Sequence, residues 1–116
     1  MVNLLKKIAM KSDHKNYKHA TIVLRGGAVV AFGANLGKRH SEVVALSKIW
    51  PNKRKGCRIV NIRIRRDGSF GMSKPCKNCS KFLKENGVIS VTYTVPNTLP
   101  TLKAYVGDGY NFTEKI

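Results

Sequence analysis

Four residues of this sequence have the types and spacing of a metal-dependent catalytic site. They belong to two short motifs: H-x-E, in which Glu42 follows His40, and P-C-x-x-C, in which Cys76 and Cys79 follow a proline. Imidazole and thiolate are ligands that zinc prefers, and three protein ligands leave a fourth position for water. A carboxylate beside such an ion can transfer protons during hydrolysis. The motifs predict a zinc ion held by His40, Cys76 and Cys79, with Glu42 as the catalytic acid and base.

The cysteine pair alone is a weaker signal. A C-x-x-C motif can be a redox pair, half of a zinc ribbon or a chance spacing. A thioredoxin-like pair would follow the first strand of a β–α–β unit, and a ribbon would need a second C-x-x-C, which the sequence lacks. Histidine is therefore the best further ligand. His14 and His19 have no carboxylate two residues further on, so we expect both to lie at the surface.

The hydrophobic pattern predicts the elements that must position these residues. Two strands joined by Gly26-Gly27 form a hairpin, because glycine tolerates the positive φ of a tight turn. The H-x-E motif begins a helix that Pro51 ends, and the P-C-x-x-C motif begins a helix that ends at Gly87. The expected helices cover 3–11, 39–50 and 75–87, and the expected strands cover 21–24, 28–32, 57–66 and 88–95. We assign no element to the tail after residue 95.

Residue spacing within these elements indicates what they bury. The helix over 39–50 has apolar residues at helical spacing, namely Val43, Leu46, Ile49 and Trp50. The strand over 57–66 alternates, with Val60, Ile62 and Ile64 on one face and Asn61, Arg63 and Arg65 on the other. Cys57 is expected to be a small buried side chain at the start of this strand. The order of elements predicts an α/β fold with a single mixed sheet flanked by helices, forming one domain over 1–116.

The paired motifs resemble those of the cytidine deaminase-like superfamily, which includes deoxycytidylate, tRNA adenosine and polynucleotide cytidine deaminases. The resemblance covers residues 19–95 and includes the order hairpin, H-x-E helix, strand, P-C-x-x-C helix, strand. It implies a three-layer α/β/α sandwich and one catalytic Zn²⁺. It also implies hydrolysis of an amino group from a nucleobase, with Glu42 transferring the protons.

The resemblance also suggests two substrate-binding residues. Asn35 stands after the second hairpin strand, where an asparagine of the family often contacts the base. Lys74 replaces the usual serine or glutamate before the P-C pair, and we expect it to meet a phosphate. Ser41 replaces the more common alanine between the histidine and the glutamate. The segment before Pro75 is longer than in the tRNA adenosine deaminases and resembles deaminase-like proteins of large viruses and phages.

The charge of the chain indicates a polyanionic partner. Lysine and arginine number 22 against 6 acidic residues, which gives a formal net charge of +16. Basic proteins bind nucleic acids because each neutralised phosphate releases a counterion. Basic runs at 52–56 and 63–66 are expected to flank the site. Aromatic residues that could stack on unpaired bases are Phe70, Tyr93 and Tyr105.

Cysteine content and hydropathy indicate the setting. Three cysteines do not form a disulfide framework, and the start of the chain does not resemble a secretory signal. We therefore expect a reducing intracellular compartment, cytoplasmic or nuclear, for a protein that is not secreted. No apolar run approaches the roughly 20 residues of a membrane span, so no membrane partner is expected.

The sequence therefore predicts a zinc-dependent deaminase that converts cytosine to uracil in single-stranded DNA or RNA. Three alternatives stay open. One is a deaminase of free cytidine or deoxycytidine nucleotides, and another is a deaminase of adenine in tRNA, because both rings use the same zinc and glutamate. The third is an inactive zinc-containing module that binds nucleic acid.

Overall fold

The computed structural model describes residues 2–95 and 111–115. Three α-helices, α1 (Val2–Ala9), α2 (Ser41–Leu46) and α3 (Lys77–Glu85), and one 3₁₀ helix, η1 (Pro51–Lys53), are formed. The strands are β1 (Lys18–Arg25), β2 (Ala28–Ala34), β3 (Arg58–Ile64), β4 (Ser90–Thr94) and β5 (Asn111–Lys115). The seven predicted elements are all present, and β5 lies in the tail to which the sequence assigned no element.

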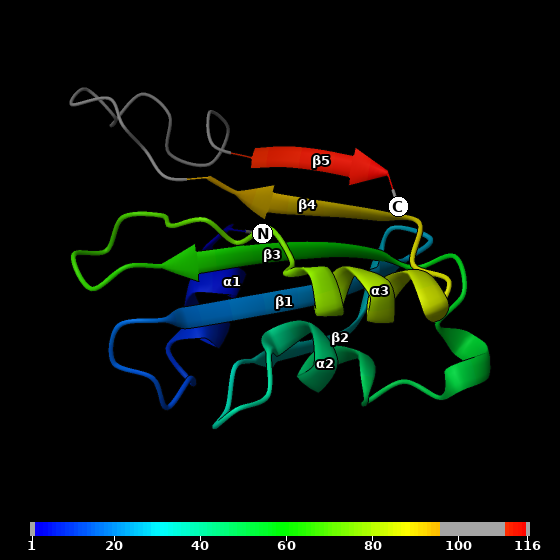
Figure 1. The fold of residues 1–116 in the computed structure, drawn as a ribbon, viewed down its shortest axis with the longest axis horizontal. Coiled ribbons are helices and arrows are strands. Elements are labelled where there is room, and N and C mark those ends of the chain that lie inside the picture. The colour runs from blue at the N-terminus through cyan, green and yellow to red at the C-terminus, as the bar shows by residue number, and fades with distance from the viewer. Residues whose placement is uncertain (1, 96–110, 116) are drawn as a thin grey trace.

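The strands form one mixed sheet in the order β2-β1-β3-β4-β5 (Figure 1). β1 pairs antiparallel with both β2 and β3, and β4 pairs antiparallel with β5. β3 and β4 are parallel, so the chain crosses over between them through α3. The hairpin turn has the predicted positive φ values at Gly26 and Gly27, 58° and 83°. These pairings place the residues of β1 and β3 in the middle of the sheet.

One face of the sheet is covered by α1 (Figure 1). Leu5, Ile8 and Ala9 are buried there against side chains of the sheet. Those side chains are Ala20 and Ile22 of β1, Ala34 of β2 and Ile62 of β3. The three-residue and four-residue spacings of these residues put their side chains on one stripe of the helix.

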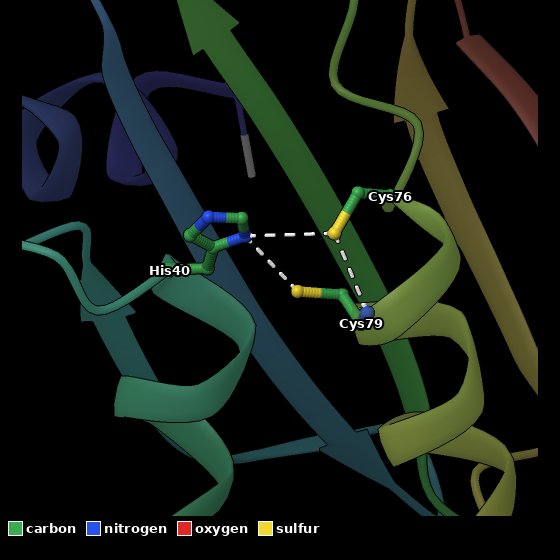
Figure 2. Close-up of side chains that lie close together, drawn as sticks. All are labelled: His40, Cys76 and Cys79. Carbon is green, nitrogen blue, oxygen red and sulfur yellow. Dashed lines mark hydrogen bonds between the residues drawn. The ribbon is translucent and has the colours of Figure 1, made fainter.

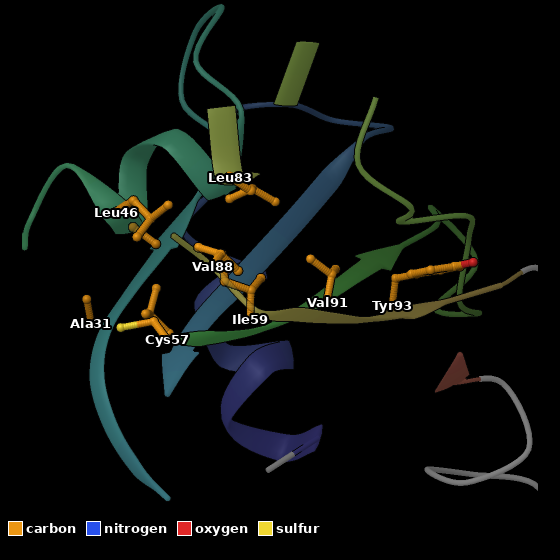
Figure 3. Close-up of a cluster of buried hydrophobic side chains, with 10 residues drawn as sticks. Ala31, Leu46, Cys57, Ile59, Leu83, Val88, Val91 and Tyr93 are labelled. Carbon is orange, nitrogen blue, oxygen red and sulfur yellow. The ribbon is translucent and has the colours of Figure 1, made fainter. Parts of the chain in front are cut away.

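The other face is covered by α2 and α3 (Figure 1). Figure 3 shows its core, in which Leu46 of α2 and Leu83 of α3 lie over Ile59 and Val91 of the sheet. α2 lies very close to β2. A Cβ added to Gly33 of β2 would lie only 2.8 Å from the Val44 side chain of α2. With helices on both faces, the α/β/α sandwich predicted from the sequence is confirmed.

Local signals fix the C-terminal end of α3 as predicted, although the helix begins at Lys77 rather than at residue 75. Asn86 caps the helix, Gly87 follows with φ 78°, and its N–H donates to the carbonyl of Lys84. The N–H of Val88 donates back to the carbonyl of Leu83, which completes a Schellman motif. The apolar side chains of Leu83 and Val88 are buried in the same core. Cys57 is also fully buried directly before β3, as expected.

Two expectations about burial need correction. α2 ends at Leu46 rather than at residue 50, and Trp50 is 79% exposed. The last apolar residues of the predicted helix lie in turns before η1, so helical spacing no longer directs Trp50 to the core. Asn61 shares a strand face with Arg63, as predicted, but it is fully buried. That face packs under α2 and α3, so alternation identified the face but not the layer that covers it.

Candidate metal centre

The N-terminal ends of α2 and α3 bring the three predicted ligands together (Figure 2). His40 is the residue before α2, Cys76 is the residue before α3, and Cys79 lies in the first turn of α3. His40 and Cys76 have extended backbones (ψ 151° and 169°). Nδ1 of His40 lies 3.0 Å from Sγ of Cys79 and 3.8 Å from Sγ of Cys76. The three ligand atoms lie within 4.8 Å of one another.

This donor set fits a zinc ion. With Zn–N and Zn–S bonds of about 2.0 and 2.3 Å, a tetrahedral ion separates its ligand atoms by about 3.5 Å. The nitrogen–sulfur distances of 3.0 and 3.8 Å lie on either side of this value. His40 and Cys76 are exposed whereas Cys79 is buried, so the cluster is open on one side. An open side is what a catalytic site needs, because water and substrate must reach the ion.

The charges around Cys79 also favour a cation. Burial raises the pKa of the Cys79 thiol above its ordinary value, and the Glu42 carboxylate and the Cys76 thiol raise this pKa further. A bound dication would offset this effect and stabilise the thiolate. The backbone N–H of Cys79 already donates to Sγ of Cys76 at 3.4 Å. The helix end therefore supplies one hydrogen bond to the sulfur, and a metal would supply the missing charge.

Glu42 lies beside the cluster and inside the fold. It is in the first turn of α2 and is only 5% exposed. Oγ of Ser41 donates to its Oε1 at 3.1 Å. A hydrogen bond to Glu42 is also among the causes that raise the pKa of the Cys79 thiol, so the carboxylate lies within reach of that sulfur. A buried carboxylate held next to a metal cluster can exchange protons with a water molecule on the ion.

A buried polar network continues from Glu42 across the sheet. Oγ1 of Thr21 lies 2.7 Å from Oγ of Ser41 and donates to Oδ1 of Asn61 at 2.6 Å. Oγ of Ser73 donates to the Asn61 carbonyl at 3.0 Å. All of these side chains are at most 3% exposed. The network joins the carboxylate on α2 to the segment that leads into Cys76.

Sequence reasoning did not find this network. Thr21 and Asn61 are paired across β1 and β3 although they lie forty positions apart in the chain. No motif marks them. The available signal was Thr21 alone, a polar residue at the start of the apolar run 21–24, since buried polar groups need partners.

A cavity of about 540 Å³ opens at the cluster. His40, Glu42 and Cys76 line it, and so do both predicted substrate-binding residues, Asn35 and Lys74. The structure thus places those predicted residues around one cavity, with Cys79 in the adjoining cluster. The roles of Asn35 and Lys74 in substrate binding stay predictions.

Asn35 is buried, and its side chain already bridges two backbone groups. Its Oδ1 accepts from the His19 N–H at 2.9 Å, and its Nδ2 donates to the Tyr17 carbonyl at 2.6 Å. An amide has two N–H groups and two lone pairs on oxygen, so one of each stays available toward the cavity. Asn35 can therefore keep its hydrogen bonds to the backbone of Tyr17 and His19 and still form a hydrogen bond to a ligand.

The expectation that His19 is a surface residue is wrong. It lies in β1, is partly buried and lines the cavity. Burial, with the positive charge of Arg63 as a second cause, lowers its pKa from 6.5 to about 4. His19 is therefore neutral at pH 7. His14 also lines the cavity, with its Nε2 2.7 Å from the Gly37 carbonyl oxygen. Neither histidine belongs to the metal cluster.

Of the predicted stacking aromatics, the two that the structure describes, Phe70 and Tyr93, do not line the cavity. Phe70 packs against the core under α1, and Tyr93 is only 6% exposed in the other core. Tyr105 lies outside the described residues. Among the described residues, the aromatic residue that lines the cavity is Tyr17, in the chain just before β1. It escaped notice because nothing in the sequence near Tyr17 resembles a motif.

The chain is similar to a solved structure of RibD from Acinetobacter baumannii. The two chains superpose with a TM-score of 0.56 at 15% identity, over 92% of this chain and 31% of RibD. The fold is cytidine deaminase-like. The chain thus spans less than a third of that protein's length, and this likeness shows the fold alone. No protein-family model and no curated protein matches the sequence.

The cytidine deaminase-like fold accounts for the place of the cluster, because its helix ends meet over the middle of the sheet. Within the described part of the chain, no helix has the length and apolar character needed to cross a membrane. The fold and the convergent ligands together make this region a candidate metal centre.

Proposed function

We propose that the protein is a zinc-dependent hydrolytic deaminase that converts cytosine to uracil in single-stranded DNA or RNA. The observation that supports it most is the meeting of His40, Cys76 and Cys79 beside the buried Glu42, at the edge of one cavity. A structural zinc site needs neither an open side nor a buried carboxylate next to its ligands.

His40, Cys76 and Cys79 would hold the zinc ion. When bound, it supplies a Lewis acid that makes water a nucleophile near neutral pH. Glu42 takes a proton from the attacking water and delivers it to the ring nitrogen of cytosine. It then takes the water's second proton, from the hydroxyl group now on the ring carbon, and transfers it to the departing ammonia as the carbon–nitrogen bond breaks. Ser41 holds the carboxylate through Oε1 at 3.1 Å, so that one oxygen stays oriented during these transfers.

The charge at the cavity supports an anionic substrate. Lys38, Arg39 and Lys74 line the cavity, and Glu42 is the only acidic residue among the described residues that line it. The chain as a whole carries a formal net charge of +16. A field this wide exceeds what one phosphate requires, whereas a polynucleotide presents a charge at every nucleotide. This favours the polymer over a free nucleotide.

A free nucleotide is the second candidate. The cavity of about 540 Å³ falls within the range of small-molecule pockets, and its three cations could bind a single phosphate. Deamination of adenine in tRNA would require the same cavity to hold a purine ring. The assay must therefore separate these substrates.

The test is turnover by zinc-loaded protein of four substrates: a cytosine-containing DNA oligonucleotide, the matching RNA, deoxycytidylate, and a tRNA with a target adenine. Conversion of an oligonucleotide to the uracil product, lost in Glu42→Ala, is the expected result. Turnover of deoxycytidylate alone would replace the polymer with a free nucleotide, and turnover of the tRNA alone would replace cytosine with adenine.

A matched variant controls for the loss of one negative charge. Glu85 lies on the exposed side of α3, where it pairs with Lys81 at 3.9 Å. Glu85→Ala should keep full activity, because this exposed pair is remote from the described cavity lining. Zinc-loaded protein with no turnover of any of the four substrates would contradict the proposal and favour the inactive binding module.

A further inference from the structure

Tyr17 presents an aromatic ring at the mouth of the cavity. It lines the same cavity as His40 and Glu42, and it is 55% exposed. The next residue begins β1, and the alternation along this strand puts Tyr17 on the side of His19 and Thr21. This is the side of the sheet that carries the candidate site. A large exposed aromatic ring beside a cavity lined by cations is a surface on which a planar ligand group can stack.

Arg63 supports this ring from β3. Its guanidinium carbon lies 4.7 Å from the centroid of the Tyr17 ring. The cross-strand register explains the contact, because Arg63 is paired with His19, two residues beyond Tyr17. A guanidinium over an aromatic face is attractive and covers one face of the ring. The opposite face is then the one that a ligand can use.

The arginine is itself held in place. Arg63 packs over the backbone of Gly71, where a Cβ would lie 2.9 Å from its Cδ and would require the arginine side chain to shift. Nε of Arg63 is buried and makes no hydrogen bond. No ion pair to Arg63 occurs among residues 2–95 of the described chain. Its charge is therefore not neutralised by a carboxylate there and adds to the positive field at the mouth.

The backbone of Tyr17 is also fixed. Its carbonyl accepts a hydrogen bond from Nδ2 of the buried Asn35 at 2.6 Å. The ring is thus restrained by the arginine and the main chain by the asparagine. A group that is ordered before binding loses less entropy when a ligand arrives.

We propose that Tyr17, supported by Arg63, is a stacking platform for an unpaired nucleobase of single-stranded nucleic acid, next to the base that enters the cavity. The proposal rests on the proposed function, in which the substrate is a polymer. A free nucleotide would fill the cavity and would have no second base for this ring. The platform thus distinguishes a polynucleotide from a mononucleotide.

The experiment measures binding rather than turnover. Zinc-loaded Glu42→Ala protein, which holds the substrate without converting it, is titrated into a fluorescently labelled single-stranded DNA oligonucleotide with one cytosine. Three further substitutions are made in this background: Tyr17→Ala, Tyr17→Phe and Trp50→Ala. Trp50 is the matched control, because it is an exposed aromatic near Lys48 and Arg54 that lines a separate hollow.

Tyr17→Ala should weaken binding about tenfold, the usual effect of removing one base–aromatic stack. Tyr17→Phe keeps the ring, and Trp50→Ala lies away from the cavity, so both should stay within about twofold of the parent. The dependence of affinity on salt should be the same for Tyr17→Ala and the parent, because the substitution removes no phosphate contact. An oligonucleotide with abasic positions flanking the cytosine should bind about tenfold more weakly to the parent, with no further loss in Tyr17→Ala.

Two results would overturn the platform. If the parent binds the oligonucleotide and Tyr17→Ala binds equally well, the platform is wrong while the polymer substrate stands. If the parent does not bind the oligonucleotide, the platform and the polymer substrate both fail, and deoxycytidylate turnover then decides separately whether the protein is a deaminase. Thermal unfolding of each variant checks that a loss of binding is not a loss of folding.

Discussion

The two faces of the sheet are built from the same strands but differ in character. Under α1, β1 contributes Ala20 and Ile22 to a core whose buried cluster is entirely apolar. Under α2 and α3, the same strand contributes Val23 to an apolar core but also Thr21, which is fully buried and polar. Along the second face, the buried side chains thus change from an apolar core to a hydrogen-bonded network that ends at Glu42.

This difference shows how one small sheet can serve both stability and chemistry. Buried apolar side chains stabilise the fold roughly in proportion to their area, wherever they lie. Buried polar side chains stabilise it little, but they fix the orientation of their partners when every group is satisfied. Substitutions on the α1 face should therefore alter stability without altering the site. Substitutions in the polar network beside Glu42 should instead alter the site.

The largest expected effect is on metal binding. Cys79→Ala removes one of three ligands and should lower zinc affinity by more than about 100-fold, because even supporting residues of such sites contribute 10–100-fold. Cys57→Ala is the matched control, since Cys57 is equally buried but lies outside the cluster. Zinc content after dialysis against a competing chelator measures the difference. Equal zinc retention in both variants would place the metal elsewhere.

The next effect concerns stability under α1. Leu5 is 1% exposed, so Leu5→Ala should lower the free energy of unfolding by about 2–5 kcal/mol through lost burial and a cavity. Leu4→Ala changes a neighbour that is 40% exposed and should cost less than about 0.5 kcal/mol. Urea unfolding checks both values. Activity per folded molecule should be unchanged in each variant. A loss of turnover in Leu5→Ala alone would show that the core under α1 also influences the site.

A pH effect belongs to the site face. His19 has a pKa of about 4 when folded and 6.5 as the ordinary value, so the unfolded chain binds more protons between these limits. Its neutral form therefore stabilises the fold above pH 6.5, and this contribution is lost as the pH falls toward 4. We expect roughly 1–3 kcal/mol, since water still reaches part of the ring. As the pH falls across this range, the unfolding free energy of the wild type should decrease by this amount relative to that of His19→Gln, and a constant difference would contradict the shift.

The smallest effect tests the hydroxyl network. Thr21→Val keeps the shape of a fully buried side chain and removes the hydroxyl that contacts Ser41 at 2.7 Å and Asn61 at 2.6 Å. Because Ser41 orients Glu42, kcat should fall about tenfold, equivalent to about 1.4 kcal/mol, with KM and zinc content unchanged. Thr21→Ser restores the hydroxyl and should recover most of the activity. An unchanged kcat in Thr21→Val, at equal zinc content, would show that the network has no influence on Glu42.

Much of the candidate site could be predicted because its signals are local. His40 and Glu42 stand two residues apart, and Cys76 and Cys79 stand three apart, so each pair lies within one helix end. The glycine turn of the hairpin and the Schellman end of α3 are equally local. The burial of Asn61 and the exposure of Trp50 could not be predicted, because each depends on which layer covers the segment.

The sequence by itself determined which residues could bind a metal and transfer a proton, since those properties belong to the side chains and to their spacing along the chain. It also determined the strands and helices that carry them, through patterns that repeat every two or every three to four residues. Only the tertiary structure decided what surrounds them. The contacts of Thr21 with Asn61 and of Tyr17 with Arg63 join residues forty or more positions apart, and they exist because β1 pairs with β3 in one register. Such pairing is set by the packing of the whole sheet between its helices, which no short stretch of sequence encodes.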